Sequence, residues 1–409
     1  MRAVLLSRVS NRSPVHAGDL GRRGGRARRG APGRRLVTAA LTVLHLAANR
    51  WWTGSADPII HLVAGLRARG HRVLLGVIPG DRFEAKAKQA GLELVEGLHM
   101  DARRGPRALA SDVLRLRALI RDESVDVVHT HHSHDHWLAV LTRPKRAQGG
   151  RPPVVRTFHN LRSVRRDRLG STLYRRTAAV FAVSRVIESR CREIGIPPER
   201  IFWIPGAVDL TRFTANADGT PIREEFKLGD APVVASVARL ATNRGHELLL
   251  SGFRLLVSTM PRARLLLIGK GETRTRLEQL VGELGLGGHV IFTGYRDADL
   301  PAVLAAADCF ALMAAGSDES CRAALEAMAA ARPVIARHVG ALPETVVHGE
   351  TGLLIDDDRP ESIARALETI LGDPGRGRAM GSAGRASAEE RFSAERSVET
   401  VERVYQGIW

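Results

Sequence analysis

Residues 308–337 read DCFALMAAGSDESCRAALEAMAAARPVIAR, and this stretch decides the fold class. It begins with a short apolar run (308–314), which is typical of a buried strand, and passes through a polar turn into a helical pattern over 321–331. A second apolar run, PVIAR (333–337), follows at once. A strand, a helix and a strand in this order predict a parallel βαβ unit.

The start of the predicted helix is suited to bind phosphate, because it offers free N–H groups and the positive end of the helix dipole. Asp318 or Ser320 can cap this helix, and Arg322 adds positive charge near the first turn. Glu326 lies among apolar residues, which include Cys321. A carboxylate buried there needs a hydrogen-bond donor, and the two hydroxyls of a ribose meet that need. A solvent-facing helix carboxylate is the alternative.

The same alternation of short apolar runs and helical patterns extends along the chain from Leu36. The strands expected in a first series are 41–47, 71–78, 125–131, 153–159, 179–184 and 200–209. Those expected in a second series are 233–240, 263–271, 289–295, 308–314 and 333–337. Two series of similar size predict an α/β chain with two Rossmann-like, doubly wound domains that face a central cleft.

A length of 409 residues suits two domains of about 150–200 residues each. We expect an N-terminal domain over 36–210, a C-terminal domain over 211–390 and a last helix over 391–409. Residues 1–35 hold ten arginines against one acidic residue and have no hydrophobic period, so we expect a disordered tail. An electrostatic tether is the alternative interpretation of that tail.

The net charge of +17 comes almost entirely from arginine, which is also the pattern of a GC-rich genome. Nucleic-acid binding is therefore not expected, because the arginines are dispersed and aromatic residues make up only 4% of the chain. No apolar run approaches the roughly 18–20 residues that span a bilayer. Cys191, Cys309 and Cys321 lack metal-ligand spacing, so we expect free thiols and a cytoplasmic protein.

From these residues outward, the sequence resembles glycosyltransferase family 4, the retaining group with the GT-B fold. The family mark is two acidic residues separated by seven, then Glu-Ala-Met-Ala and Pro-Val. Asp318 and Glu326 stand at the two acidic places here, with Asp in place of the usual Glu. The resemblance implies that Asp318 contacts the donor sugar and Glu326 the ribose. Glu319 is the alternative to Asp318, and Ala331 replaces a common glycine.

Other motifs agree with this resemblance. The segment ASVARLATNRGHE (235–247) matches a family loop with two cations, which implies that Arg239 and Arg244 neutralise the leaving diphosphate. Gly269 belongs to a Gly-x-Gly turn near the nucleotide, and Tyr295 to the segment that cradles the base. For the arginines, two solvated surface residues are the alternative.

The N-terminal half supplies the acceptor side if the resemblance holds. Gly54 lies in a loop after the first strand, near the donor diphosphate and acceptor. Trp51 and Trp52 beside it would stack on a sugar or pack in the core. The stretch HTHHSHDHW (129–137) holds five histidines, of which His131 aligns with the family's active-site histidine. His159 is a weaker candidate.

A metal site in that histidine stretch is not expected, because neighbouring strand residues point to opposite faces and no Glu or Cys completes a set. The stretch LRSVRRDRLGSTLYRR (161–176) leaves three interpretations open. It can lie on an anionic membrane, form a solvated helix face, or bind an anionic acceptor such as a phosphorylated saccharide or lipid.

Taken together, these features predict a retaining glycosyltransferase of the hexosyltransferase type in cell-envelope glycan synthesis. It would move a sugar from a nucleoside diphosphate sugar to a saccharide or a lipid-linked acceptor, without cofactor or metal, in the cytoplasm or against its membrane. A sugar-nucleotide epimerase of the same fold, a non-catalytic sugar-nucleotide binder and a nucleic-acid binder are the alternatives.

Overall fold

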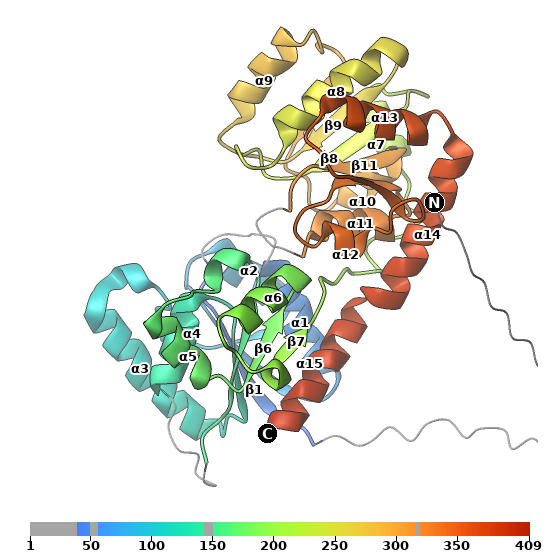
Figure 1. Ribbon diagram of the computed structural model, residues 1–409. Helices are drawn as coiled ribbons and strands as arrows, with labels where there is room; N and C mark the ends of the chain where they lie inside the picture. The colour runs from blue at the N-terminus through green and yellow to red at the C-terminus, as the bar shows by residue number, and fades with distance from the viewer. Residues whose placement is uncertain (1–38, 50–55, 143–149, 316–319) are drawn as a thin grey trace, which may run out of the picture. The chain divides into compact units, whose positions relative to one another are not determined.

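Two parallel β-sheets organise the part of the chain that the structure describes, residues 39–409 without 50–55, 143–149 and 316–319 (Figure 1). In this computed structural model, Ala40–Trp409 forms one unit. The tail predicted over residues 1–35 lies outside the described residues.

The first sheet has seven parallel strands in the order β3-β2-β1-β4-β5-β6-β7. Its strands are β1 (Thr42–Ala47), β2 (Arg72–Val77), β3 (Glu93–Leu94), β4 (Val127–Thr130), β5 (Val154–Phe158), β6 (Ala179–Ala182) and β7 (Ile201–Trp203). Its helices are α1 (Ala56–Ala68), α2 (Arg82–Gln89), α3 (Gly105–Asp122), α4 (Ser133–Thr142), α5 (Arg168–Arg175) and α6 (Arg185–Glu193). Short 3-10 turns at Ala102–Arg104, Leu161–Ser163 and Pro198–Arg200 join some of them.

The second sheet has six parallel strands in the order β10-β9-β8-β11-β12-β13. Its strands are β8 (Val233–Val237), β9 (Arg264–Ile268), β10 (Val290–Gly294), β11 (Cys309–Leu312), β12 (Val334–Arg337) and β13 (Gly352–Ile355). Its helices are α7 (Thr220–Glu225), α8 (His246–Thr259), α9 (Arg274–Glu283), α10 (Leu300–Ala306), α11 (Arg322–Ala329), α12 (Leu342–Thr345), α13 (Pro360–Leu371) and α14 (Pro374–Arg391).

Buried aliphatic residues cover both faces of each sheet, which is why the strands are near-continuous apolar runs rather than alternating ones. The central strand β1 is typical, since Val43, Leu44 and Leu46 are fully buried. The two-sheet architecture predicted from the sequence is therefore present.

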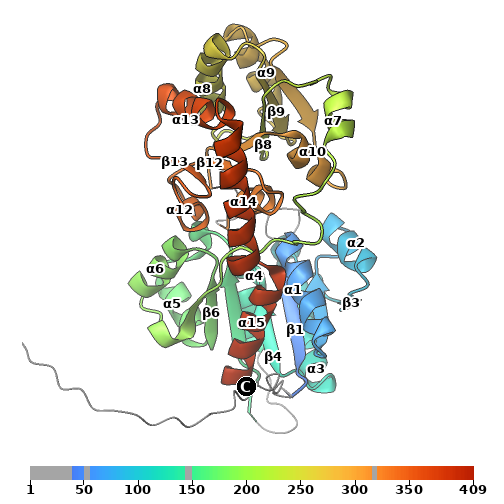
Figure 2. The ribbon, with the colours of Figure 1, turned by 90° about the vertical axis from the view of Figure 1, so that its right-hand side faces the viewer.

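The last helix, α15 (Ala394–Ile408), follows the second series of elements in the chain but packs on the first sheet (Figure 2). Val398, Val401 and Tyr405 join the core cluster formed by β1, β2 and α1. The two helices approach so closely that a Cβ on Gly65 of α1 would lie 2.5 Å from Val398 Cγ2. This contact brings Tyr405 under the first sheet, where it meets the site described below.

The predicted end of one strand is wrong, and so is one of the two alternative helix caps, Ser320, while the other, Asp318, lies outside the described residues. The strand expected over 200–209 ends at Trp203, since the chain then turns through Pro205 and Gly206 towards the second sheet. Ser320 does not cap the helix before Glu326. Cys321 occupies the N-cap position of α11 with a φ of 52° and no capping side-chain hydrogen bond.

Candidate active site

Each sheet reverses its strand order once, between β1 and β4 in the first sheet and between β8 and β11 in the second. Ligands of doubly wound folds bind at such reversals, outside the carboxyl ends of the strands. A cavity of about 70 Å³ lies between the ends of the first sheet, the chain joining the sheets, α11 and α15. Its lining includes Asp57, His131, His159, Arg322 and Glu326.

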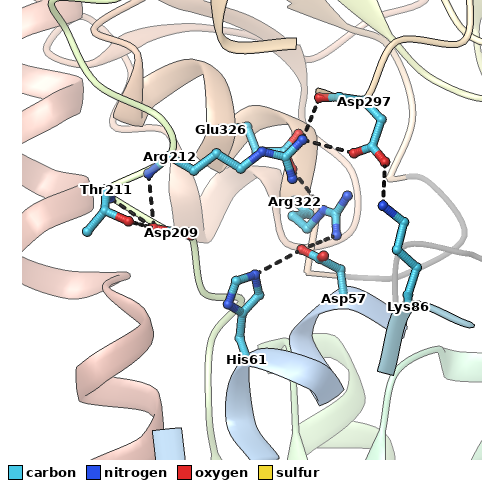
Figure 3. Close-up of polar contacts among 9 residues, drawn as sticks. All are labelled: Asp57, His61, Lys86, Asp209, Thr211, Arg212, Asp297, Arg322 and Glu326. Carbon is cyan, nitrogen blue, oxygen red and sulfur yellow. Dashed lines mark hydrogen bonds and ion pairs between the residues drawn. The ribbon is translucent and has the colours of Figure 1, made fainter. Parts of the chain in front are cut away.

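Arg322 joins the two halves of the cavity through two carboxylates (Figure 3). Its Nε donates to Glu326 Oε1 at 3.0 Å, and its Nη1 lies 2.8 Å from Asp57 Oδ2, on the first turn of α1. His61, one turn further along α1, has its Nε2 3.4 Å from the same Asp57 oxygen. The structure thus brings Arg322 and Glu326 together, and it adds a carboxylate from the opposite half.

Electrostatics explain how this cluster tolerates burial. Glu326 is only 3% exposed, and burial raises its pKa although Arg322 opposes the shift. Burial would also raise the pKa of Asp57, but the hydrogen bond with His61 and the charge of Arg322 lower it to about 2. The same hydrogen bond raises the pKa of His61. Glu326 therefore remains the carboxylate with the greater need for an added donor.

A second ion-pair group lies beside the first and is centred on Asp297, which follows β10 (Figure 3). Arg212, on the segment that joins the sheets, donates from Nη2 to Asp297 Oδ1 at 2.9 Å and to its backbone oxygen at 2.6 Å. Lys86 of α2 donates to Asp297 Oδ2 at 3.1 Å. The joining segment is itself held by Asp209, which accepts from the backbone N–H groups of Thr211 and Arg212.

The predicted phosphate cations lie at the second reversal, after β8. Arg239 is exposed and donates from Nη2 to Glu272 Oε2 at 3.0 Å. The pKa of Glu272 is lowered by a backbone hydrogen bond and by Arg239, and the charge of Arg244 contributes as well. Arg239 and Arg244 therefore both act on the Glu272 carboxylate, and their contact with a diphosphate stays a prediction.

The glycine turn after β9 fits tightly against the loop that carries these arginines. A Cβ on Gly269, which has a φ of 155°, would lie 2.0 Å from Ala238 O, and one on Gly271 would lie 1.9 Å from Leu240 O. Tyr295 follows β10 with its ring 39% exposed, and it has Lys270 and Arg82 of α2 at 5.6 and 5.8 Å from the ring centre. This half-exposed ring is available to a flat base.

His131 lies inside a group of histidines at the first reversal rather than alone. Its Nε2 is 3.0 Å from His45 Nδ1, and its Nδ1 is 3.3 Å from His159 Nε2. His129 stacks on it, with ring centres 4.3 Å apart. Burial lowers the pKa of His45 to about 3 and takes those of His129 and His131 well below 6.5. These rings are neutral at physiological pH.

Their hydrogen bonds form one continuous chain. Tyr405 of α15 lies 2.5 Å from His129 Nδ1 and 3.4 Å from His45 Nε2, and His129 Nε2 lies 2.7 Å from Thr157 Oγ1. A neutral imidazole donates from one nitrogen and accepts at the other, so the chain can be satisfied from Thr157 to His159 in a single direction. It fixes the orientation of His131, whose two nitrogens are both engaged.

Three of these rings, His45, His129 and His131, also offer nitrogen atoms within 4.8 Å of one another, a spacing that could collect a metal ion. Sequence reasoning missed His45 because it comes from the neighbouring strand. The hydrogen-bond chain already gives every one of these nitrogens a partner, so neutral rings account for the cluster without an ion. The absence of a metal stays a prediction.

Asp135 organises the turn that carries His131. It accepts from the backbone N–H groups of Ala48, His131 and His132 at 2.8 to 3.2 Å, and it is fully buried. Burial raises its pKa to about 6, against the charge of Arg156. This carboxylate ties the end of β1 to the start of α4, so it holds the predicted reaction face in place.

Several predicted residues lie outside the described part of the chain. These are Trp51, Trp52, Gly54, Asp318 and Glu319. Conversely, sequence reasoning did not select Asp57, His61, Lys86, Arg212 or Asp297, which make most of the polar contacts in Figure 3. Only the position of Asp57 in the first turn of a helix after the first strand gave a signal for any of them.

Comparisons with known proteins agree with this geometry. Residues 53–212 match the family described as Glycosyltransferase Family 4, and residues 220–387 match the one described as Glycosyl transferases group 1. The chain is 32% identical over 328 residues to the GDP-mannose-dependent alpha-(1-6)-phosphatidylinositol monomannoside mannosyltransferase of Mycobacterium tuberculosis, covering 75% of this chain and 81% of that protein.

The protein of the same name from Mycolicibacterium smegmatis is 36% identical over 214 residues, which span 50% of this chain and 56% of that protein. The solved structure of Anabaena Alr3699/HepE in complex with UDP-glucose has a TM-score of 0.77 at 20% identity and covers 90% of this chain and 100% of that one. Sucrose-phosphate synthase from Thermosynechococcus elongatus has a TM-score of 0.70 at 22% identity, covering 90% and 99%. The predicted fold is confirmed.

Proposed function

Because this chain belongs to glycosyltransferase family 4 of the group 1 glycosyltransferases, we propose that it moves mannose from GDP-mannose to a phosphatidylinositol-based acceptor, with retention of configuration. The donor and acceptor are those in the names of the mycobacterial relatives. The observation that supports a sugar-nucleotide site best is the contact of Arg322 with both Glu326 and Asp57.

In this proposal the leaving diphosphate lies between two sources of positive charge. Arg239 and Arg244 approach from the loop after β8, and Arg322 stands in the first turn of α11. Negative charge grows on the diphosphate as the glycosidic bond breaks, so fixed cations and backbone N–H groups stabilise the transition state more than the ground state. Glu326 accepts from the ribose hydroxyls, and Asp318 orients the donor sugar.

His131 shapes the reaction face on the acceptor side. Its two nitrogens contact His45 and His159. His131 therefore has two proposed roles, to position His159 and to contact a substrate through its ring. Both rings line the cavity, and imidazole nitrogens donate to or accept from hydroxyls such as those of a sugar. The variants His131→Ala and His159→Ala distinguish positioning from substrate contact. A residue that contacts substrate should change kcat and KM when it is replaced, even when the variant folds normally.

The donor is tested by thermal stabilisation of the purified chain with a panel of UDP- and GDP-sugars. We expect GDP-mannose to raise the unfolding temperature of the wild type and to fail with Glu326→Ala. Stabilisation by none of the panel, or an undiminished effect in Glu326→Ala, would contradict the proposed donor site. Release of GDP only when acceptor is present then separates glycosyl transfer from donor hydrolysis or epimerisation.

Contact with an anionic membrane belongs to the same proposal, because the acceptor is a lipid. No helix among the described residues is long and apolar enough to cross a bilayer. Exposed leucines nevertheless accompany arginines on two helices of the first half, Leu114 on α3 and Leu169 on α5. Flotation with phosphatidylglycerol vesicles but not phosphatidylcholine vesicles is the expected result, weakened by salt.

A further inference from the structure

A second cavity, of about 80 Å³, lies between α4, β5 and α5 on the acceptor half of the chain. The residues that matter for its chemistry are Ser133, Arg156, Ser163 and Arg165, with Trp137 and Tyr174 as aromatic walls. A water molecule occupies roughly 30 Å³ of liquid, so this space accepts a group larger than one or two waters. None of these residues takes part in the donor site described above.

Arg156 is the unusual member of this lining. It stands in the middle of β5, and its side chain is 1% exposed. Its Nε and Nη1 atoms are buried and have no hydrogen-bond acceptor within the described residues. Burial lowers the pKa of Arg156 to about 10, so the guanidinium stays charged at neutral pH. A buried cation with free N–H groups costs folding free energy unless something accepts from it.

Asp135 forms an ion pair with Arg156 but does not accept a hydrogen bond from it. Its Oδ1 lies 3.6 Å from Arg156 Nη1, which is an ion pair beyond hydrogen-bond distance. The oxygens of Asp135 already accept from three backbone N–H groups, that of Ala48 after β1 and those of His131 and His132 before α4. The ring of Phe158, 5.1 Å from the guanidinium carbon, offers no acceptor atom of its own. The donors of Arg156 therefore remain available on the side of the cavity.

The rest of the cavity suits an anion with several oxygens. Ser133 brings a hydroxyl group to the lining and Arg165 brings a second cation, while the hydroxyl of Ser163 already donates to Asn160 O at 2.7 Å. The one lining carboxylate, Asp167, is occupied, because its Oδ1 accepts from Gly170 N at 2.6 Å and its Oδ2 lies 3.7 Å from Arg165. Guanidinium groups bind phosphate oxygens through paired, charge-assisted hydrogen bonds.

We propose that this cavity is a phosphate-binding subsite, with Arg156 as its central ligand, for the phosphate of the acceptor. The proposal rests on the proposed function for the identity of the acceptor, but not for the binding of phosphate. Leu169, which is 69% exposed, lines the rim, so the site opens on the same α5 surface that we assign to the membrane. Asp135 joins Arg156 to the backbone of His131, so an anion here lies next to the reaction face.

The test measures phosphate binding by calorimetry on the full chain without donor, using inorganic phosphate and glycerophosphoinositol as separate probes. We expect Arg156→Met to weaken binding of whichever probe binds by about tenfold or more, since it keeps an unbranched apolar stem, although a shorter one, and removes every donor. Arg121→Met on α3, an exposed arginine away from the cavity, should leave binding unchanged. Binding of glycerophosphoinositol alone identifies a lipid headgroup as the source, and binding of both probes identifies the phosphate itself.

Unchanged phosphate binding in Arg156→Met, or no binding of either probe by the wild type, overturns the proposal. If Arg156→Met does not fold, Arg156→Lys keeps the charge, and we expect it to bind phosphate more weakly than the wild type with GDP-mannose stabilisation retained. A purely structural role for Arg156 predicts the reverse, equal binding in Arg156→Lys. Loss of GDP-mannose stabilisation in the wild type would overturn the proposed function and leave the phosphate result standing.

Discussion

The carboxyl ends of the two sheets occupy equivalent places in equivalent folds, yet they carry opposite chemistry. At the end of the first sheet, rings such as His45, His129 and His131 are buried and neutral, and hydrogen bonds run from one to the next. At the end of the second sheet, Arg239 and Arg322 are each paired with a carboxylate. One half of the site is built from neutral hydrogen bonding, and the other from charge.

We relate this difference to what each half would bind under the proposed function. A diphosphate carries charge that grows during the reaction, so cations have something to stabilise. Sugar hydroxyls carry no charge, and neutral imidazoles donate and accept without the desolvation cost of an ion. The first half also carries charge, on Asp57 beside Arg322 and in the pair of Arg156 and Asp135, and it is to the place of this pair that we assign an anion.

Low pH should have the largest effect on this difference, because it favours protonated, charged histidines in the neutral half. The pKa values of His45, His129, His131 and His132 lie below 6.5 in the folded chain, so the unfolded chain binds more protons as the pH falls. This contribution to stability is complete above pH 6.5 and is lost on acidification, by about 2 kcal/mol at pH 5 for His45, whose pKa is about 3. Asp135 has a raised pKa, so the folded chain takes up roughly one proton at this carboxylate as the pH falls. This uptake partly offsets the loss of stability.

Urea unfolding at pH 7 and pH 5 measures the effect, and several kcal/mol of lost stability are expected from the group as a whole. His45→Phe, which cannot take a proton, should reduce the loss by about 2 kcal/mol, whatever it does to stability at pH 7. An unfolding free energy that does not change between the two pH values would show that these rings are not buried and neutral.

The same comparison shows where sequence reasoning succeeds. In the second half, Glu326, Arg322 and the Gly269 turn could be selected from the sequence, since they lie within short motifs whose chemistry depends on neighbours in sequence. In the first half, the sequence singled out His131 in the histidine stretch, and the structure places His129, two residues away, on the same face of β4. His45 and Tyr405 could not be found in this way, because strand order and the return of α15 bring them there from distant parts of the sequence.

The same reason explains the ion pairs that sequence reasoning missed. Asp57, Lys86 and Asp297 meet their partners from elements far apart in the chain, and no local pattern marks a surface carboxylate as one that will face a cleft. Side-chain capping of α11 was predicted from residue type alone and failed for Ser320. The preference of a residue type for the cap position does not determine which residue of the loop occupies that position, and here it is Cys321.

Glu326→Gln sharpens the comparison on the charged side. The amide keeps the size of the side chain but accepts less strongly from ribose and no longer neutralises Arg322. We expect kcat/KM for GDP-mannose to fall by about a hundredfold, or roughly 3 kcal/mol. Glu278→Gln, an exposed carboxylate of α9 that pairs with Arg274, is the matched control and should keep full activity. Equal activity of the two variants would remove Glu326 from the donor site.

Gly271→Ala tests whether the turn beside the cations needs its close backbone approach. The added Cβ would lie 1.9 Å from Leu240 O, which is backbone and cannot move aside as a flexible side chain would. We expect a loss of roughly 1–3 kcal/mol in unfolding free energy and weaker donor binding. In the control, Gly282→Ala, the Cβ meets nothing within 4 Å inside α9, and stability should rise by up to about 1 kcal/mol. Similar losses in both variants would point to a general intolerance of α9 and its turn.

Lys86→Met has the smallest expected effect, and it concerns an ion pair through which α2 of the first half meets the second half. Lys86 and Asp297 pair at 3.1 Å, but both side chains are about one-third exposed, and Arg212 gives Asp297 a second partner. Water and salt screen such a pair, so we expect at most about 1 kcal/mol of coupling between Lys86→Met and Asp297→Asn in a double-mutant cycle. The coupling should shrink in 1 M salt, because screening then acts over about 3 Å. A coupling that stayed constant in high salt would contradict this and would mean that the pair is shielded from solvent. Charge would then stabilise the contact between the two halves in addition to binding the diphosphate.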